Sequence, residues 1–165
     1  GGPEDARLLG LDHGLPISKL RGVPTSARVK LKRQRITTCG QLLRAAAAAP
    51  RRAELVEATG IDAAILLQLV CRADLARIRG IGTVFGLMLE EVGVRVIEQL
   101  AVCNAAELHA ALRAYNVQDD WLGARLPTEL IAAFRATLEE VADWVATARE
   151  LPIVITVDDM TESAD

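Results

Sequence analysis

Apolar residues recur at helical spacing along most of this chain. The widest apolar face belongs to residues 63–72, and its width predicts a buried, central helix. That face is formed by Ile65, Leu66, Leu67, Leu69 and Val70. A long apolar stripe in residues 128–150 predicts a second extended helix, with Trp144 near the edge of the stripe. The stripe is formed by Leu130, Ile131, Phe134, Leu138, Val141, Val145 and Ala148.

Capping and turn residues divide the remaining chain into shorter helices. Thr38 and Gln41 have the spacing of a capping box, and Asn104 and Glu107 have it again. Alanine and leucine dominate the composition and aromatic residues make up 3%, which favours helices packed through small side chains. We therefore expect an all-α fold. The expected helices cover residues 17–20, 25–35, 39–49, 51–58, 63–72, 84–93, 96–102, 105–115 and 128–150, with one more short helix capped by Asp74.

The sequence repeats itself at a spacing of 58 residues, without a gap. Apolar positions coincide in the two copies, which indicates a duplicated structural unit. The coinciding pairs are Leu20 with Ile78, Val23 with Ile81, Leu31 with Leu89, Ile36 with Val94, and Leu42 with Leu100. All ten residues are expected to be buried, and residues 17–43 should superpose on residues 75–101.

A glycine-rich turn lies at the start of the second copy, in the sequence Gly80-Ile81-Gly82. Glycine reaches backbone angles that are closed to other residues, and it leaves amide N–H groups unshielded for an anion. This turn resembles the helix-hairpin-helix motif, which grips a nucleic-acid phosphate in many proteins that carry it. We call residues 17–35 the first hairpin and residues 75–93 the second hairpin.

The order of the hairpins and helices resembles the domain of unknown function family 4332, over about residues 15–115. The resemblance implies tandem helix-hairpin-helix units and carries no established activity. The expected organisation is an extended lead-in over 1–14 and a duplicated domain over 15–116, with repeats near 17–74 and 75–116. Residues 117–150 are expected to form a linker and a long packing helix. Residues 151–165 are expected to form a strand or arm and an acidic tail.

The C-terminal segment differs from the rest in its β-branched residues 153–157. This composition predicts a short terminal strand or an extended arm. A strand would need a partner, either a second copy or a further domain, whereas an arm would lie along the helices. The acidic residues 158–165 are expected to form a frayed tail.

Charge is distributed unevenly along the chain, although the net charge is only −3. Residues 13–53 hold ten Lys and Arg and no Asp or Glu, whereas residues 54–165 hold eight basic and nineteen acidic residues. The basic segment 13–53 therefore suits a polyanionic binding partner, or it is attracted to the acidic segment 54–165.

Few residues suggest catalytic chemistry. The three cysteines, Cys39, Cys71 and Cys103, and the two histidines, His13 and His109, stand apart without metal-ligand spacing. We therefore expect no enzymatic activity, no metal and no cofactor, and no small-molecule substrate is evident. The sparse, odd cysteine count is typical of a reducing compartment, so we expect a cytoplasmic protein, and no stretch is apolar enough to span a membrane.

Two functions follow from these patterns. In the first, the chain binds the nucleic-acid backbone without sequence specificity, and in the second it is a scaffold that binds another protein or a second copy of itself. Each hairpin has one of the two features expected of a phosphate-binding site. The second hairpin has the better turn, and the first has the positive charge. Pro24 and Arg28 stand in the first hairpin where the second has Gly82 and Gly86. The candidate nucleic-acid-binding residues are Lys19, Arg21, Gly22, Arg28, Lys32, Arg35, Arg79, Gly80 and Gly82.

Overall fold

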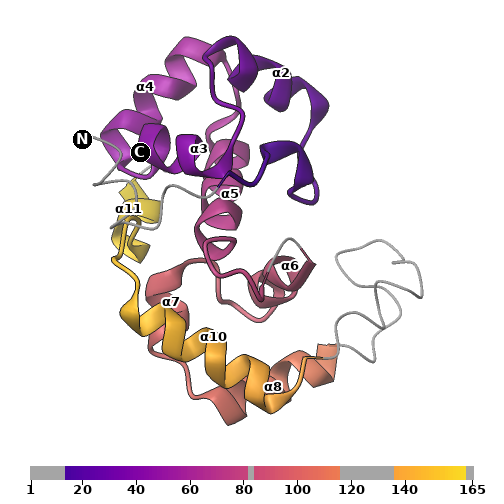
Figure 1. The fold of residues 1–165 in the computed structure, drawn as a ribbon. Helices are drawn as coiled ribbons and strands as arrows, with labels where there is room; N and C mark the ends of the chain where they lie inside the picture. Colours follow the sequence, from indigo (N-terminus) through magenta and orange to yellow (C-terminus); the bar gives the residue numbers. More distant parts are fainter. Residues whose placement is uncertain (1–13, 82–83, 116–135, 163–165) are drawn as a thin grey trace.

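The computed structural model describes residues 14–81, 84–115 and 136–162, and most of these residues are helical (Figure 1). The described ranges contain no β-strand, only an isolated bridge between Pro16 and Thr38. The all-α prediction is confirmed. The helices are η1 (Ile17–Lys19), α2 (Thr25–Arg33), α3 (Cys39–Ala46), α4 (Ala49–Thr59), α5 (Ala63–Leu75), α6 (Val84–Glu91), α7 (Ile97–Ala101), α8 (Ala105–Tyr115), α10 (Leu138–Glu150) and α11 (Val157–Glu162).

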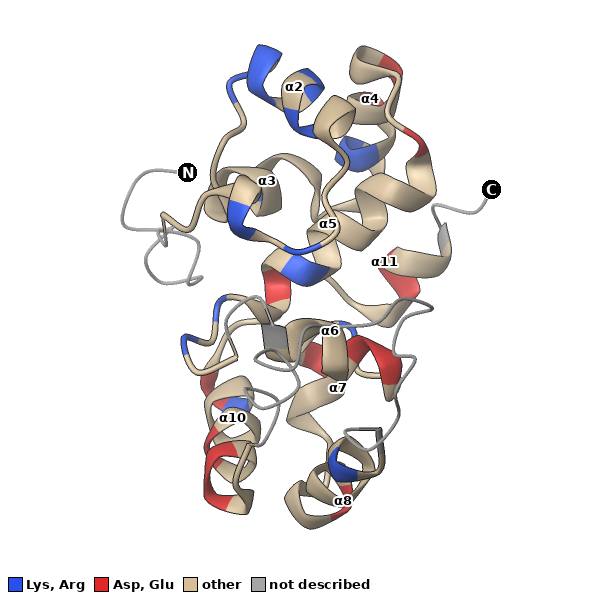
Figure 2. Ribbon diagram, turned by 90° about the vertical axis from the view of Figure 1, so that its right-hand side faces the viewer, with Lys and Arg blue, Asp and Glu red and all other residues tan. Residues whose placement is uncertain are grey.

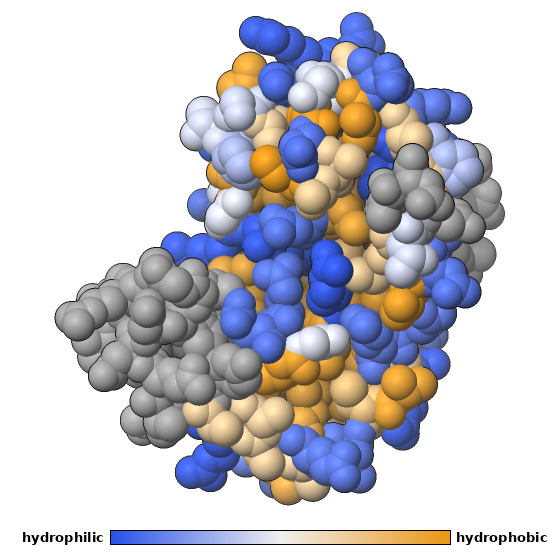
Figure 3. Space-filling model, turned by 180° about the vertical axis from the view of Figure 1, so that it is seen from behind, coloured by the Kyte–Doolittle hydropathy of each residue, from blue (hydrophilic) through white to orange (hydrophobic). Residues whose placement is uncertain are grey.

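The helices form two lobes joined by α5 (Figure 1). Helices α2, α3 and α4 pack with most of α5 around one apolar core, which includes Leu66, Leu69 and Val70. Helices α6, α7, α8 and α10 form a second core, to which α5 contributes its last residue, Leu75. Seen from behind, hydrophilic residues lie at the level of the junction between the lobes, with apolar patches above and below (Figure 3). The predicted central position of α5 is confirmed.

The apolar positions of the repeat are buried as expected. Leu31 and Leu89, which correspond in the two copies, are both 0% exposed. Of the ten residues in the five pairs, Val23 alone is partly exposed, because it lies in the open turn of the first hairpin. The burial of corresponding residues supports a duplicated unit.

Backbone hydrogen bonds repeat in the same register. After the second helix of each hairpin, the Ile36 N–H donates to the Leu31 carbonyl at 3.0 Å, and the Val94 N–H donates to the Leu89 carbonyl at 2.8 Å. Each pair closes the helix and returns the chain to its core. Element order is also repeated, since α2 and α3 correspond in sequence to α6 and α7.

The start of α3 and the start of α7 show what the two copies share and where they differ. The Gln41 side chain accepts a hydrogen bond from the Thr37 N–H at 2.8 Å, and Gln99 accepts one from the Arg95 N–H at 2.7 Å. The predicted capping box is complete at α3, where Thr38 accepts from the Gln41 N–H. At α7 the corresponding residue is Val96, which has no side-chain oxygen and cannot complete the box.

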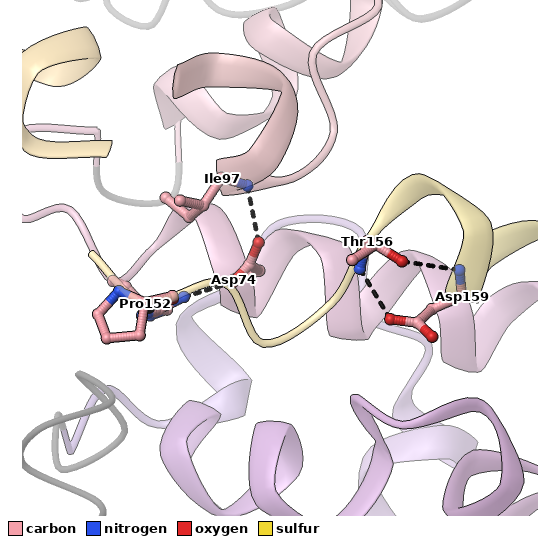
Figure 4. Close-up of polar contacts among 6 residues, drawn as sticks. Asp74, Ile97, Pro152, Thr156 and Asp159 are labelled. Atoms are coloured by element: carbon pink, nitrogen blue, oxygen red, sulfur yellow. Dashed lines mark hydrogen bonds and ion pairs between the residues drawn. The ribbon is translucent and has the colours of Figure 1, made fainter. Parts of the chain in front are cut away.

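Asp74 does not begin a new helix, contrary to our prediction. Helix α5 continues through it to Leu75, and the Asp74 side chain turns inward, where the residue is 0% exposed. It accepts from the Ile97 N–H at 2.8 Å (Figure 4) and pairs with Arg77 at 3.0 Å. Asp74 thus caps α7 from a distance of 23 residues in sequence.

Two other helix boundaries also differ from expectation. Helix α3 ends at Ala46, and α4 begins at Ala49, so residues 39–49 are not one helix. Helix α10 begins at Leu138 because Thr137 is extended and forms a capping box with Glu140, so a continuous helix over residues 128–150 is wrong. Leu138 itself is 47% exposed and lies outside the apolar stripe.

Trp121 and residues 128–135 lie outside the described ranges, as do residues 1–13.

Of the two alternatives predicted for the C-terminal segment, a strand or an arm, the structure has the arm, over residues 151–156. Ile155 is fully buried in the first core, so the arm connects the second lobe back to the first (Figure 1). Arg77 donates to the Pro152 carbonyl at 2.7 Å, and Arg52 donates to the Asp159 carbonyl at 2.6 Å. Arg77 thus satisfies a backbone carbonyl of the arm, and Arg52 satisfies one in α11, the helix that follows it.

The acidic segment after the arm forms helix α11 and is not frayed over residues 157–162. Thr156 and Asp159 exchange hydrogen bonds in the manner of a capping box, at 3.1 Å and 2.8 Å (Figure 4). An acidic residue in the first turn of a helix is also stabilised by the helix dipole. Met160 packs into the first core, which anchors this short helix.

Candidate nucleic-acid interface

The first hairpin presents an open turn between η1 and α2. Gly22 has a φ of 70°, a conformation that glycine reaches without strain. Pro24 follows with an extended backbone, and α2 begins directly after it. The sequence therefore sets this turn locally, through one glycine and one proline.

Three basic side chains border the hollow beside this turn. Its volume is about 820 Å³, and its lining includes Lys19, Arg21, Gly22 and Arg28. A neighbouring hollow of about 330 Å³ is lined by Arg28 and Lys32, so Arg28 borders both. No carboxylate is among the residues that line either hollow. The surface can therefore receive an anion without meeting a like charge.

The predicted cations of the first hairpin are exposed. Lys19, Arg21, Arg28, Lys32 and Arg35 all lie at the surface, and Figure 2 shows the basic residues gathered around α2. The ion pairs formed in the described part of the chain are Arg72 with Glu90 and Arg77 with Asp74. None of the first-hairpin cations pairs with a described carboxylate.

The amino end of α2 adds backbone donors to this surface. Its N-cap residue is Pro24, which makes no side-chain cap, and the first intrahelical bond comes from the Arg28 N–H at 3.1 Å. The N–H groups of the first turn, those of residues 25–27, have no intrahelical acceptor. Thr25 lines the larger hollow, so the positive end of the α2 dipole faces it.

The second hairpin is arranged differently, because α10 covers its turn. Arg79 and Gly80 border a hollow of about 440 Å³ that Glu140 and Asp143 also line. A β-carbon on Gly80 would lie 2.8 Å from the Trp144 Nε1. The acidic face of α10 and the close indole make this turn a poor phosphate site. The two hairpins line separate hollows, and Gly82 lies outside the described ranges.

The constraint on Gly80 differs from the one expected from sequence. Positive φ values occur at Gly22, Gly60 and Gly93 among the described glycines, but not at Gly80. What limits Gly80 is the close approach of Trp144, a residue that the sequence placed only near the edge of an apolar stripe. Trp144 is 3% exposed and contacts Phe85, with ring centroids 5.0 Å apart.

Sequence reasoning also missed Arg72, which lies behind the first hairpin. Its guanidinium donates to the Arg21 carbonyl at 3.1 Å and to Glu90 at 3.2 Å. The repeat gave no signal for it, because its contacts join residues 51 and 18 positions apart in sequence. The Glu90 carboxylate is thus paired with a cation.

The groups with possible chemistry elsewhere are engaged or buried. Burial raises the pKa of the Cys39 and Cys71 thiols to about 12, and the His109 Nε2 lies 3.1 Å from the Ala136 carbonyl. Within the described residues, no three His, Cys, Asp or Glu side chains gather as a metal ion would require. None of the helices in those ranges is long and apolar enough to cross a membrane.

Comparison with known proteins places these features in a family. No curated protein and no solved structure matches the chain significantly. The family model described as Domain of unknown function (DUF4332) matches residues 21–151, which include α2, the whole second hairpin and helix α10. The matched region holds most of the sequence, and the chain belongs to the DUF4332 family.

Proposed function

We propose that this protein is a non-catalytic module that binds the nucleic-acid backbone through its first hairpin, without sequence specificity. The observation that carries the proposal is the basic hollow beside Gly22, where exposed cations meet the amino end of α2 and no carboxylate intrudes. Cations and helix amides together suit phosphate oxygens.

The absence of aromatic residues from both hollows favours the backbone over the bases. Their linings consist of aliphatic, small polar and basic residues. Stacking on aromatic rings is the usual way to hold unpaired bases, and it is worth about 1–3 kcal/mol per base. Contacts limited to phosphate carry no direct sequence information.

The division of roles between the hairpins is consistent with this proposal. The second hairpin packs its turn against Trp144, which leaves the first hairpin as the exposed one. The chain's overall acidity does not oppose binding, because the cations of α2 are grouped on one lobe (Figure 2).

A charge-reversal experiment tests the proposal. We expect a variant with Arg28, Lys32 and Arg35 replaced by Glu to lose binding to a labelled generic duplex. Wild-type affinity should fall with salt, with a log–log slope of about −0.9 for each phosphate neutralised. Binding is measured by fluorescence anisotropy at several salt concentrations.

A matched control separates local contacts from net charge. Arg44, Arg51 and Arg113 are also exposed, and their replacement by Glu changes the net charge by the same amount. This control should keep most of the wild-type affinity at moderate salt. Equal losses in both variants would contradict a site on the first hairpin. No duplex or single-strand binding at low salt, together with a concentration-dependent dimer, would instead support the protein-scaffold alternative.

A further inference from the structure

Arg72 links the two hairpins at the junction of the lobes. It lies on α5, and its Nη1 donates to the Arg21 carbonyl at 3.1 Å, while its Nη2 contacts the Glu90 carboxylate at 3.2 Å. The side chains of Arg72 and Glu90 are only 14% and 18% exposed. A partly buried pair of this kind holds its geometry better than a pair in open solvent.

The hydrogen bond to Arg21 also fixes the direction of the Gly22 N–H. The Arg21 carbonyl and the Gly22 N–H belong to the same peptide group, and this peptide is trans. In a trans peptide, the carbonyl and the N–H point in opposite directions. Because the carbonyl is held toward Arg72, the Gly22 N–H points away from it, and Gly22 lines the basic hollow.

Gly22 is restricted by Arg72 as well as by its backbone angle. A β-carbon at this position would stand 3.1 Å from the Arg72 Nη1, and the φ of 70° would be strained for other residues. The guanidinium therefore supports the back of the turn. Arg72 is not among the residues that line the hollow, so it does not meet a bound anion directly.

We propose that Arg72 is a positioning residue for the anion site: it acts through the Arg21–Gly22 peptide to hold the Gly22 N–H as a fixed donor, and Glu90 keeps Arg72 in place. This inference rests on the proposed function of the first hairpin. It gives the second hairpin a supporting role, since Glu90 orients the cation that supports the first turn. A hydrogen bond to the carbonyl also polarises the peptide, which makes its N–H a stronger donor.

The test compares Arg72→Met, Arg72→Lys and Glu90→Gln in the full chain, after thermal melting shows that each variant folds. We expect Arg72→Met to weaken duplex binding by about tenfold, the effect of losing one charge-assisted hydrogen bond. The log–log salt slope should stay at its wild-type value, because the Gly22 N–H is uncharged and no cation that neutralises a phosphate is removed. Arg72→Lys should restore part of the affinity, and Glu90→Gln should lose less than Arg72→Met.

A spectroscopic measurement follows the Gly22 amide itself. In ¹⁵N-labelled wild-type protein, inorganic phosphate should shift the Gly22 amide resonance, and this shift should disappear in Arg72→Met. Hydrogen exchange of the α3 and α4 amides should stay unchanged in that variant, which controls for the fold.

The outcomes separate this inference from the proposed function. A salt slope smaller by about 0.9 in Arg72→Met would show a direct phosphate contact and overturn the positioning role. A phosphate-induced shift of the Gly22 amide that persists unchanged in Arg72→Met would overturn it as well. If wild type binds no duplex but its Gly22 amide responds to phosphate in an Arg72-dependent way, the proposed function fails and the positioning role stands.

Discussion

Arg35 and Gly93 occupy the same position in the two repeats, and both adopt a left-handed backbone, with φ values of 62° and 91°. Each residue ends the second helix of its hairpin and turns the chain back toward its core. Glycine has this conformation without strain, whereas arginine pays about 1–2 kcal/mol for it. Arg35 therefore keeps a charge at the surface at a cost in stability.

The first prediction concerns this strain. Arg35→Gly should be more stable than Arg35→Ala by about 1 kcal/mol, because both remove the charge and only glycine relieves the backbone. The difference is measured from urea unfolding midpoints. Equal stabilities would mean that the left-handed backbone at Arg35 carries little strain.

The second prediction concerns the approach of Trp144 to Gly80. Gly80→Ala should destabilise the fold by about 1–3 kcal/mol, because the new β-carbon would meet the indole at 2.8 Å. In a Trp144→Phe background the same substitution should cost less, since the ring no longer reaches as far. A double-mutant cycle by chemical denaturation gives the coupling between the two sites. An unaltered stability in the single Gly80→Ala variant would argue against the close contact.

The third prediction uses the two equivalent core leucines. Leu31→Ala and Leu89→Ala should each cost about 2–5 kcal/mol, because both side chains are fully buried. The residues belong to different cores, so the costs should add in the double variant. Urea unfolding measures each value, with Val102→Ala as a control at a residue that is 82% exposed. If either leucine variant loses no more stability than Val102→Ala, the core positions predicted from the repeat are wrong.

The fourth prediction concerns Asp74. Burial raises the pKa of its carboxyl, while the Ile97 N–H and the Arg77 guanidinium act in the opposite direction. Asp74→Ala removes the carboxylate that faces the buried Arg77 and caps α7, and it should cost about 3–5 kcal/mol. The exposed N-cap Asp62 is a useful comparison, because Asp62→Ala should cost only about 1 kcal/mol. Similar costs for the two variants in urea unfolding would refute the special role of Asp74.

The fifth prediction concerns alkaline pH. The pKa of Cys39 and that of Cys71 are raised from 9.0 to about 12 by burial, so the folded state keeps both thiols protonated. Their contribution to stability is complete below pH 9 and is lost as the pH rises from about 9 toward 12. Unfolding midpoints measured across this range should fall, and a Cys39→Ala/Cys71→Ala variant should show a weaker fall. An identical pH dependence in both proteins would exclude the buried thiols as its cause.

Local interactions in the sequence determined the secondary structure and the repeat. Helical periodicity placed α5 at the centre, and the box of Thr38 and Gln41 placed the start of α3. The spacing of 58 residues predicts Leu31 and Leu89 as equivalent core positions, and both are buried. Such features depend on residues a few positions apart, or on burial, which apolar side chains favour wherever they are.

Tertiary structure alone decided which hairpin is open. By sequence, the second hairpin had the better turn and the first had the charge. The decision came from Trp144, which reaches Gly80 from helix α10, and from Arg72, which reaches the first turn across 51 residues. Tertiary structure also decided the role of Asp74, whose carboxylate caps a helix that begins 23 residues away. These contacts depend on how whole helices pack, and no local pattern of residues encodes that packing.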